Sequence, residues 1–206
     1  MTNVAIIYYS STGHVHKLAE EAAVAAEKAG AEVRLRKVAE LAPAAVVATK
    51  QEWADHVEAT KDVAEVSLDD LEWADVILFG TPTRFGLPAA QLKQFIDTTG
   101  GLWFQGKLVN KVVSSFTSTS TLHGGQESTL LALNNTFYHW GAIIVAPGYS
   151  DGIQFAPSNG NPYGTSHVSN NLVGAPNDEN LEAIAYQTRR AVQIATALKV
   201  GLAAAA

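Results

Sequence analysis

Hydroxyl residues and a glycine stand together near the start of the chain, in Ser10-Ser11-Thr12-Gly13-His14-Val15. The segment follows a short apolar run and precedes a helical pattern, so its N–H groups and hydroxyls would face an anion at a helix N-terminus. The first acidic residue is delayed until Glu20, and the first turn carries His14, His16 and Lys17 instead. An ordinary Ser or Thr helix cap explains these residues equally well. With a single glycine the segment lacks the G-x-G-x-x-G fingerprint, which favours a monophosphate over a dinucleotide pyrophosphate.

A rigid turn with one aromatic ring and one guanidinium group follows a later apolar run, in Thr81-Pro82-Thr83-Arg84-Phe85-Gly86. Phe85 can pack on a flat heteroaromatic ring while Arg84 and backbone N–H groups donate to its carbonyl and ring-nitrogen acceptors. A surface turn with a solvated arginine is the alternative interpretation. The candidate cofactor-binding residues of this turn are Pro82, Thr83, Arg84, Phe85 and Gly86.

A third hydroxyl-rich segment runs into two glycines before a helical pattern that begins near Gln126. Such a segment lets the backbone approach the edge of a ring closely. Taken alone it reads more readily as a flexible linker, and its position directly after an apolar strand pattern is what favours a binding role. The candidate residues are Ser118, Thr119, Ser120, Thr121, Gly124 and Gly125.

Single residues elsewhere are ambiguous. His139 ends a helical pattern, where an imidazolium often faces the last helix carbonyls, and tryptophans such as Trp103 are more often core residues than ligand platforms. The histidines are dispersed, and no pair with helical metal-ligand spacing has a third ligand, so we expect no metal site. The chain has no cysteine, which excludes thiolate metal sites and cysteine nucleophiles.

Two other sequence motifs lack the neighbouring residues that their functions require. Residues 101–108 nearly spell a Walker A loop, but Leu108 stands where Ser or Thr must bind magnesium. Gly148-Tyr149-Ser150-Asp151-Gly152 spells a nucleophile elbow, which would indicate a serine hydrolase. An elbow must open a helix, whereas the residues after Ser150 are rich in Pro, Gly and Asn, and His167 is the only histidine that follows.

Alternating strand and helix patterns must position these segments. Apolar β-prone runs predict buried strands at residues 4–9, 33–35, 76–80, 112–116 and 142–146, and helical patterns occupy residues 15–29, 89–98, 127–139 and the C-terminal region after Asn177. This alternation predicts one α/β domain over residues 1–206, with a doubly wound open parallel sheet and helices on both faces. Residues 43–70 and 149–176 are two inserted segments. Ligands of such sheets lie beyond the carboxyl ends of the strands, where the candidate segments fall.

The amino-acid composition limits the classes of partner that the chain is expected to bind. The 206 residues include 14 basic and 20 acidic ones, for a net charge of −6, which argues against nucleic-acid binding. The N-terminal apolar run is too short for a signal peptide, and no stretch reaches the ~18 apolar residues of a membrane helix. We therefore expect a cytoplasmic protein without a membrane span.

Four segments together indicate a resemblance to a known protein family. The chain resembles the flavodoxin-like NAD(P)H:quinone oxidoreductases of the tryptophan-repressor-binding protein (WrbA) family over essentially its full length. The specific signatures are Thr81-Pro82-Thr83-Arg84-Phe85-Gly86, Thr99-Gly100-Gly101-Leu102-Trp103, Gly124-Gly125-Gln126-Glu127 and Pro162-Tyr163-Gly164. The resemblance implies a flavodoxin-like sheet with strand order 2-1-3-4-5 and FMN as the cofactor. Departures are Ser11-Thr12, in place of a pair that often includes a tyrosine, and a less glycine-rich loop around Ser120.

The resemblance also implies roles for individual residues. The segment from Ser10 to Val15 would hold the FMN phosphate, and Thr83 to Phe85 with Ser118 to Thr121 would embrace the isoalloxazine ring. His139 would lie beside the ring as cofactor contact and catalytic residue, and Trp103 would line the substrate pocket with Thr12. Family members are typically tetramers with pockets that borrow residues from neighbouring subunits, so a homotetramer or a homodimer is expected.

The expected activity is ping-pong, two-electron reduction of quinones by NADH or NADPH through bound FMN. One alternative is a flavodoxin-type carrier of single electrons, which shares the phosphate segment but is usually shorter and more acidic. The other is the serine hydrolase suggested by the motif around Ser150.

Overall fold

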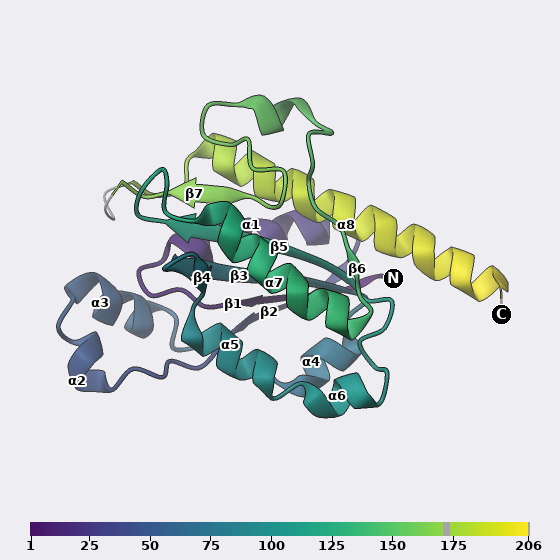
Figure 1. Cartoon of the computed structure of the whole chain (residues 1–206), viewed down its shortest axis with the longest axis horizontal. Helices are drawn as coiled ribbons and strands as arrows, with labels where there is room; N and C mark the ends of the chain where they lie inside the picture. The colour runs from purple at the N-terminus through teal and green to yellow at the C-terminus, as the bar shows by residue number, and fades with distance from the viewer. Residues whose placement is uncertain (171–173, 206) are drawn as a thin grey trace.

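The computed structural model describes residues 1–170 and 174–205, so residues 171–173 of the second inserted segment lie outside the description. A parallel sheet of strand order β2-β1-β3-β5-β6 forms its centre (Figure 1). The strands are β1 (Asn3–Tyr8), β2 (Glu32–Lys37), β3 (Val76–Arg84), β5 (Val112–Thr119) and β6 (Ile143–Ile144). This order is the predicted 2-1-3-4-5 when the principal strands alone are counted, so the flavodoxin-like α/β architecture is confirmed.

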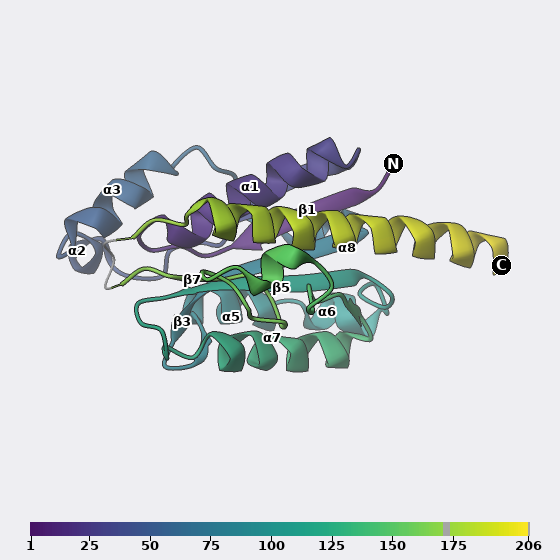
Figure 2. The ribbon, with the colours of Figure 1, turned by 90° about the horizontal axis from the view of Figure 1, so that it is seen from above.

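Helices cover both faces of the sheet, as the view from above makes clear (Figure 2). One face carries α1 (His14–Lys28) and α8 (Asp178–Ala205), and the other carries α4 (Leu68–Trp73), α5 (Ala90–Asp97), α6 (Gly100–Phe104) and α7 (Gln126–Trp140). Each face has its own apolar cluster, with Leu18 and Ile184 in one and Phe95 and Phe137 in the other. Because both faces are covered, the strand patterns are continuous apolar runs.

Helix α1 begins and ends at glycines in the left-handed region. Its buried side chains include Val15, Leu18 and Ala22, and this spacing turns one stripe of the helix toward the sheet. Gly13 precedes the helix with φ 90°, and Gly30 follows it with φ 81°. The left-handed conformation at Gly13 turns the chain sharply from β1 into the helix, which leaves the first helical N–H groups at the carboxyl edge of the sheet.

Strands β3 and β5 extend further at their carboxyl ends than their sequence patterns suggested, and β6 is shorter than its pattern. Strand β3 continues past Gly80 because Thr81 and Pro82 still pair with β5 in register, and Thr83 and Arg84 then pair with β4 (Leu87–Pro88). The predicted turn at residues 81–86 is therefore the end of a strand and a hairpin. Strand β5 likewise extends to Thr119, so its hydroxyl residues belong to the sheet and do not form a flexible linker. Strand β6 retains only Ile143 and Ile144 of its predicted run.

The first inserted segment packs beside the carboxyl edge of β1. It contains α2 (Ala44–Val47) and α3 (Gln51–Ala59) and leads into α4. Glu40 anchors it, because its carboxylate accepts hydrogen bonds from Tyr9 Oη (2.8 Å), Trp53 Nε1 (2.9 Å) and Gln91 Nε2 (2.8 Å). Three separate parts of the chain thus meet at one carboxylate next to the segment that begins at Ser10.

The second inserted segment adds a strand to the sheet. It contains the 3₁₀ helix η1 (Gly152–Phe155) and β7 (Ser166–Val168), which pairs in parallel with the end of β5. Gln187 of α8 fixes this arrangement, since its Nε2 donates to Ser115 O (2.8 Å) and its Oε1 accepts from Thr165 N (2.7 Å). At Gly164 a Cβ atom would lie 2.1 Å from Ser115 O, so no larger residue fits there. The segment therefore reaches the same edge as the candidate site.

Candidate functional site

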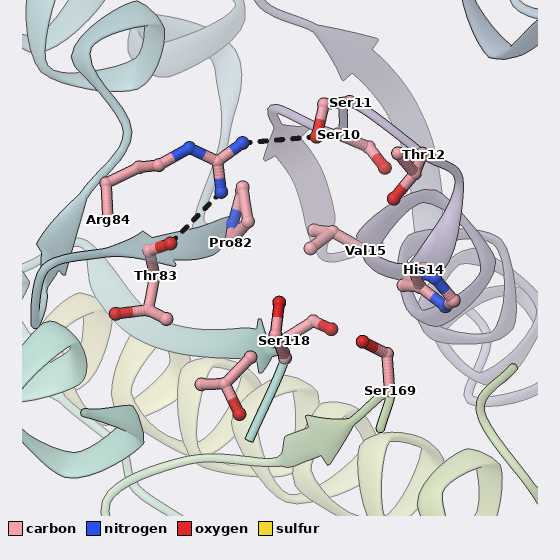
Figure 3. Close-up of a pocket in the computed structure, with 12 residues that line it drawn as sticks. Ser10, Ser11, Thr12, His14, Val15, Pro82, Thr83, Arg84, Ser118 and Ser169 are labelled. Atoms are coloured by element: carbon pink, nitrogen blue, oxygen red, sulfur yellow. Dashed lines mark hydrogen bonds between the residues drawn. The ribbon is translucent and has the colours of Figure 1, made fainter. Parts of the chain in front are cut away.

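A cavity opens at the carboxyl edge of the sheet, where the ends of β1, β3, β5 and β7 converge (Figure 3). It joins four segments that are far apart in sequence. The lining residues are Ser10, Ser11, Thr12, His14, Val15, Pro82, Thr83, Arg84, Ser118, Thr119, Ser120 and Ser169. All but Ser169 are among the residues that the sequence analysis named as cofactor ligands.

The N-terminus of α1 faces this cavity without a competing acid. The Gly13 N–H donates to Ser10 Oγ (3.0 Å), and no side chain caps the helix by a hydrogen bond. The first turn contains no acidic residue. The partial positive charge of the helix end is therefore available to an external anion.

Hydroxyl groups on this side of the cavity are arranged as donors. Ser10 Oγ accepts from Gly13, and Ser11 Oγ accepts from Arg84 Nη2 (3.1 Å), so each hydroxyl keeps its own hydrogen for another acceptor. Arg84 also donates from Nη1 to Thr83 O (3.0 Å), which holds its guanidinium across the mouth of the cavity (Figure 3). A phosphate group, which offers only acceptors, suits this arrangement.

The β3–β4 hairpin forms the opposite wall. Thr83 Oγ1 accepts from Gly86 N (3.2 Å) and donates to Gly124 O (3.3 Å), which ties the hairpin to the loop before α7. Gly125 has φ 91°, and a Cβ there would lie 2.8 Å from Gly86 Cα. Phe85, at the hairpin tip with φ 54°, is fully exposed and does not line the cavity. Gly86, Gly125 and Phe85 therefore lie beside the cavity and are not among the residues that line it.

The end of β5 supplies a wall of a different polarity. Thr119 Oγ1 donates to Thr121 O (2.8 Å), and Ser118 Oγ lies 3.0 Å from Nδ1 of His167 in β7. Both Ser118 and Thr119 line the cavity, whereas Thr121 does not. His167 is buried and also stacks on His14, with ring centroids 5.1 Å apart and an interplanar angle of 25°.

Neutral histidines surround the first turn of α1. Burial lowers the pKa of His167 to about 4, and the neighbouring His14 lowers it further. Burial likewise lowers the pKa of His56, from the first inserted segment, to about 4, with a contribution from His16. The rings of His16 and His56 are 5.4 Å apart. Both inserted segments thus contact the first turn of α1 through a histidine, which sequence reasoning missed because these contacts depend on tertiary structure.

His139 and Trp103 lie elsewhere. They are close to each other, since Trp103 Nε1 donates to His139 O (2.8 Å), but they sit at the amino edge of the sheet. Helix α7 begins beside the cavity and runs antiparallel to the strands for 15 residues, a length of about 22 Å. The expectation that His139 lies beside the ring is therefore not met within one chain, because the direction of α7 carries it to the far edge.

The nucleophile-elbow motif makes no catalytic contacts. Ser150 Oγ donates to Pro147 O (2.7 Å) and bonds Tyr186 Oη (2.6 Å), while Asp151 accepts from Ile153 N in η1. Within residues 1–170 and 174–205, no histidine forms a hydrogen bond with Ser150. These contacts give the motif a structural role in a turn.

Two further features are absent from the described residues. Residues 1–170 and 174–205 contain no group of three or more His, Cys, Asp or Glu side chains that could hold a metal ion. None of the described helices is both long and apolar enough to cross a membrane.

Known proteins resemble this chain over nearly its whole length. A family model described as NADPH-dependent FMN reductase matches residues 2–154. A Deinococcus radiodurans protein named NAD(P)H dehydrogenase (quinone) is 50% identical over 196 residues, which cover 95% of this chain and 96% of that protein. A Geotalea uraniireducens protein of the same name is 42% identical, covering 95% of this chain and 98% of its own.

Solved structures show the same fold. A WrbA-like flavodoxin from Agrobacterium tumefaciens superposes with a TM-score of 0.66 at 26% identity and covers 95% of this chain and 98% of its own. A flavodoxin from the domain Archaea superposes with a TM-score of 0.61 at 14% identity, covering 95% of this chain and 99% of its own, which supports the fold alone.

Proposed function

The chain belongs to the NADPH-dependent FMN reductase family, and from that premise we propose that it catalyses the two-electron reduction of quinones by NAD(P)H with FMN as cofactor. The observation that carries this proposal is the cavity in which hydroxyl donors at an uncapped helix N-terminus face a second wall built from β3 and β5. The relatives named NAD(P)H dehydrogenase (quinone) supply the substrate class.

The hydrogen-bond donors around the cavity suit both the phosphate group and the ring system of FMN. The segment from Ser10 to Val15 would bind the phosphate through hydroxyl groups, backbone N–H groups and the helix dipole. Arg84 would donate to the ring system from across the mouth, and its charge would favour an electron-rich ring. Pro82, Thr83 and Ser118 to Ser120 would form the walls around the ring.

When bound, FMN would accept a hydride from NAD(P)H and then pass two electrons to a quinone, in alternation. The protein's contribution is to hold the ring, keep water from the reacting face and leave an open slot for flat substrates. Thr12, which lines the cavity, would border that slot.

A second copy of the chain would complete the slot. His139 cannot reach the cavity of its own chain, and the corner around it is aromatic and exposed, with Trp103 52%, Tyr138 69% and Phe104 85% accessible. Such a surface is typical of subunit contacts. We therefore propose a homo-oligomer in which His139 and Trp103 of one copy border the cavity of another, where His139 would hydrogen-bond a quinone oxygen as it gains charge.

An absorption spectrum of the purified protein, followed by an assay with NADH or NADPH and benzoquinone, tests this proposal. We expect flavin bands, stoichiometric uptake of FMN and quinone-dependent oxidation of the nicotinamide. Correctly folded protein that took up no FMN in calorimetry would overturn it.

A further inference from the structure

Ser118 and His167 form a buried hydrogen bond on the wall of the cavity. They are register partners on β5 and β7, and Ser118 Oγ lies 3.0 Å from His167 Nδ1. His167 is 2% accessible and Ser118 is 5% accessible, so water does not compete for this bond. Ser118 also lines the cavity, so the orientation of its hydroxyl group matters to a ligand.

The surroundings of His167 determine which partner donates. Burial lowers the pKa of the His167 ring, and the backbone of Ala175 and Gly174, which lines a cavity together with His167, opposes this effect and raises it, as carbonyl groups facing a ring N–H do. Because Nδ1 lies 3.0 Å from Ser118 Oγ, we assign the ring hydrogen to Nε2, the nitrogen left to face these carbonyl groups. Burial keeps the ring neutral at physiological pH. Nδ1 is therefore an acceptor, and the Ser118 hydroxyl donates to it.

This bond leaves only lone pairs on Ser118 Oγ for the cavity. Thr119 reinforces the effect, since its hydroxyl hydrogen is used by Thr121 O. Across the cavity, Ser10 and Ser11 have the opposite arrangement, because both accept from the protein and retain their hydrogens. The two walls thus present acceptors on the β5 side and donors on the α1 side.

We propose that His167 is a positioning residue that fixes Ser118 as a hydrogen-bond acceptor, so that the β5 wall selects ligand N–H and O–H groups and rejects phosphate oxygens. This inference rests on the proposed function, because the ligand is FMN, whose ribityl hydroxyls and single ring N–H are its donors. The selection orients FMN with its phosphate toward Ser10 and Ser11. It also assigns a role in cofactor binding to the second inserted segment, which carries His167.

A double-mutant cycle on FMN affinity tests the coupling, with the dissociation constant read from quenching of flavin fluorescence. We expect Ser118→Ala to weaken FMN binding about tenfold and His167→Leu by about three- to tenfold. The combined variant should be no weaker than Ser118→Ala alone within about twofold, because His167 acts through Ser118. His167→Asn, whose side-chain carbonyl can accept from Ser118, should restore affinity to within about threefold of the unaltered chain.

Two controls separate this role from general damage to the fold. His123→Leu removes an exposed histidine that does not line the cavity and should leave the FMN dissociation constant unchanged within about twofold. Inorganic phosphate, measured as a competitor of FMN, should bind the His167→Leu and Ser118→Ala variants as it binds the unaltered chain, because it uses the α1 side. Independent, multiplicative losses in the double variant, or equal weakening of phosphate, would overturn the role of His167.

A measurement on the unaltered chain keeps the inference testable if a variant does not fold. Nitrogen-15 NMR of histidine-labelled protein should show His167 as the Nε2–H tautomer, and a hydrogen on Nδ1 would contradict the inference. Failure of the unaltered chain to bind FMN would overturn the proposed function, while the tautomer would still decide the direction of the Ser118–His167 bond. Normal FMN binding with additive variants would reject only the role of His167.

Discussion

At the scale of single residues, the direction of hydrogen bonds matters more than the presence of hydroxyl groups. Serines and threonines occur on both sides of the cavity, yet Ser10 and Ser11 accept from the protein, whereas Thr119 donates to Thr121 O. With the tautomer inferred for His167, Ser118 also donates to the protein. The sequence identifies these residues as polar and near strand ends. It does not reveal which of them can donate to a ligand, because that depends on partners brought in from distant segments.

Replacing Ser10 and Thr12 together by valine should remove FMN. The double change deletes two hydroxyls from the phosphate-facing turn, and hydrogen bonds to charged groups contribute about 1.5–3 kcal/mol each. We expect FMN binding to weaken by at least about 100-fold and the purified protein to be colourless. Ser150→Ala, which changes a hydroxyl outside the cavity, serves as the control and should remain yellow. A yellow double variant would contradict the phosphate assignment.

The buried histidines should make the apo-protein sensitive to acid. The pKa of His56 is lowered to about 4 mainly by burial, whereas histidines of an unfolded chain titrate near 6.5. Between these values the unfolded state binds more protons, so the free energy of unfolding falls as the pH drops from about 6.5 to 4. We expect the Tm of the apo-protein to decline over this range and to be nearly constant above pH 7.

His56→Gln should make that decline shallower, since one of the groups with a lowered pKa is removed. His123→Gln, at an exposed position, should leave the slope unchanged. Parallel Tm profiles for the unaltered chain and His56→Gln would show that His56 does not contribute to the acid sensitivity.

At the scale of elements, the sequence predicts the strands and helices well and their ends poorly. The apolar runs that predict β3 and β5 stop at Gly80 and Phe116, but pairing continues through Pro82 and Ser118 because backbone register does not require apolar side chains. The β3–β4 hairpin and strand β7 were not predicted from the sequence for the same reason. These extensions are what carry the binding residues into the cavity.

Replacing Glu40, which anchors the first inserted segment, should lower the free energy of unfolding. Burial would raise the pKa of Glu40, but hydrogen bonds from Ala42, Gln91, Tyr9 and Trp53 outweigh that effect and lower it. Glu40→Gln removes the charge and introduces an extra donor among these donors, so we expect a loss of about 1–3 kcal/mol in the free energy of unfolding. Glu58→Gln, which breaks an exposed pair with Lys61, should cost less than about 1 kcal/mol. Urea denaturation followed by fluorescence would measure both, and equal effects would argue against Glu40 as an anchor.

At the scale of the whole molecule, the residues of the proposed site lie at opposite edges of the sheet. The cavity lies at the carboxyl edge, and His139 with Trp103 lies at the amino edge. One chain therefore holds the proposed cofactor cavity and, separately, an exposed aromatic corner. Assembly of copies is the arrangement that can bring the two together.

Complementation between variants tests this arrangement. His139→Ala should lower quinone turnover by about tenfold or more while leaving FMN affinity within about twofold, because His139 contacts the substrate from another copy. Co-expression of His139→Ala chains with Ser10→Val/Thr12→Val chains should regain part of the activity, since the former supply FMN-loaded cavities and the latter supply His139. Light scattering would establish the oligomer. Mixed oligomers without any gain in turnover would reject a role for His139 between copies.

Local patterns by themselves determined much of this protein: the alternation of strands and helices, the parallel sheet and the turn of hydroxyl residues before α1 at Ser10 to Val15. These follow from hydrophobic periodicity and turn residues that act over a few positions. Tertiary structure alone decided that His167 meets Ser118 and that His139 faces away from its own cavity. The physical reason is that strand register and helix direction act over distances that no short pattern encodes.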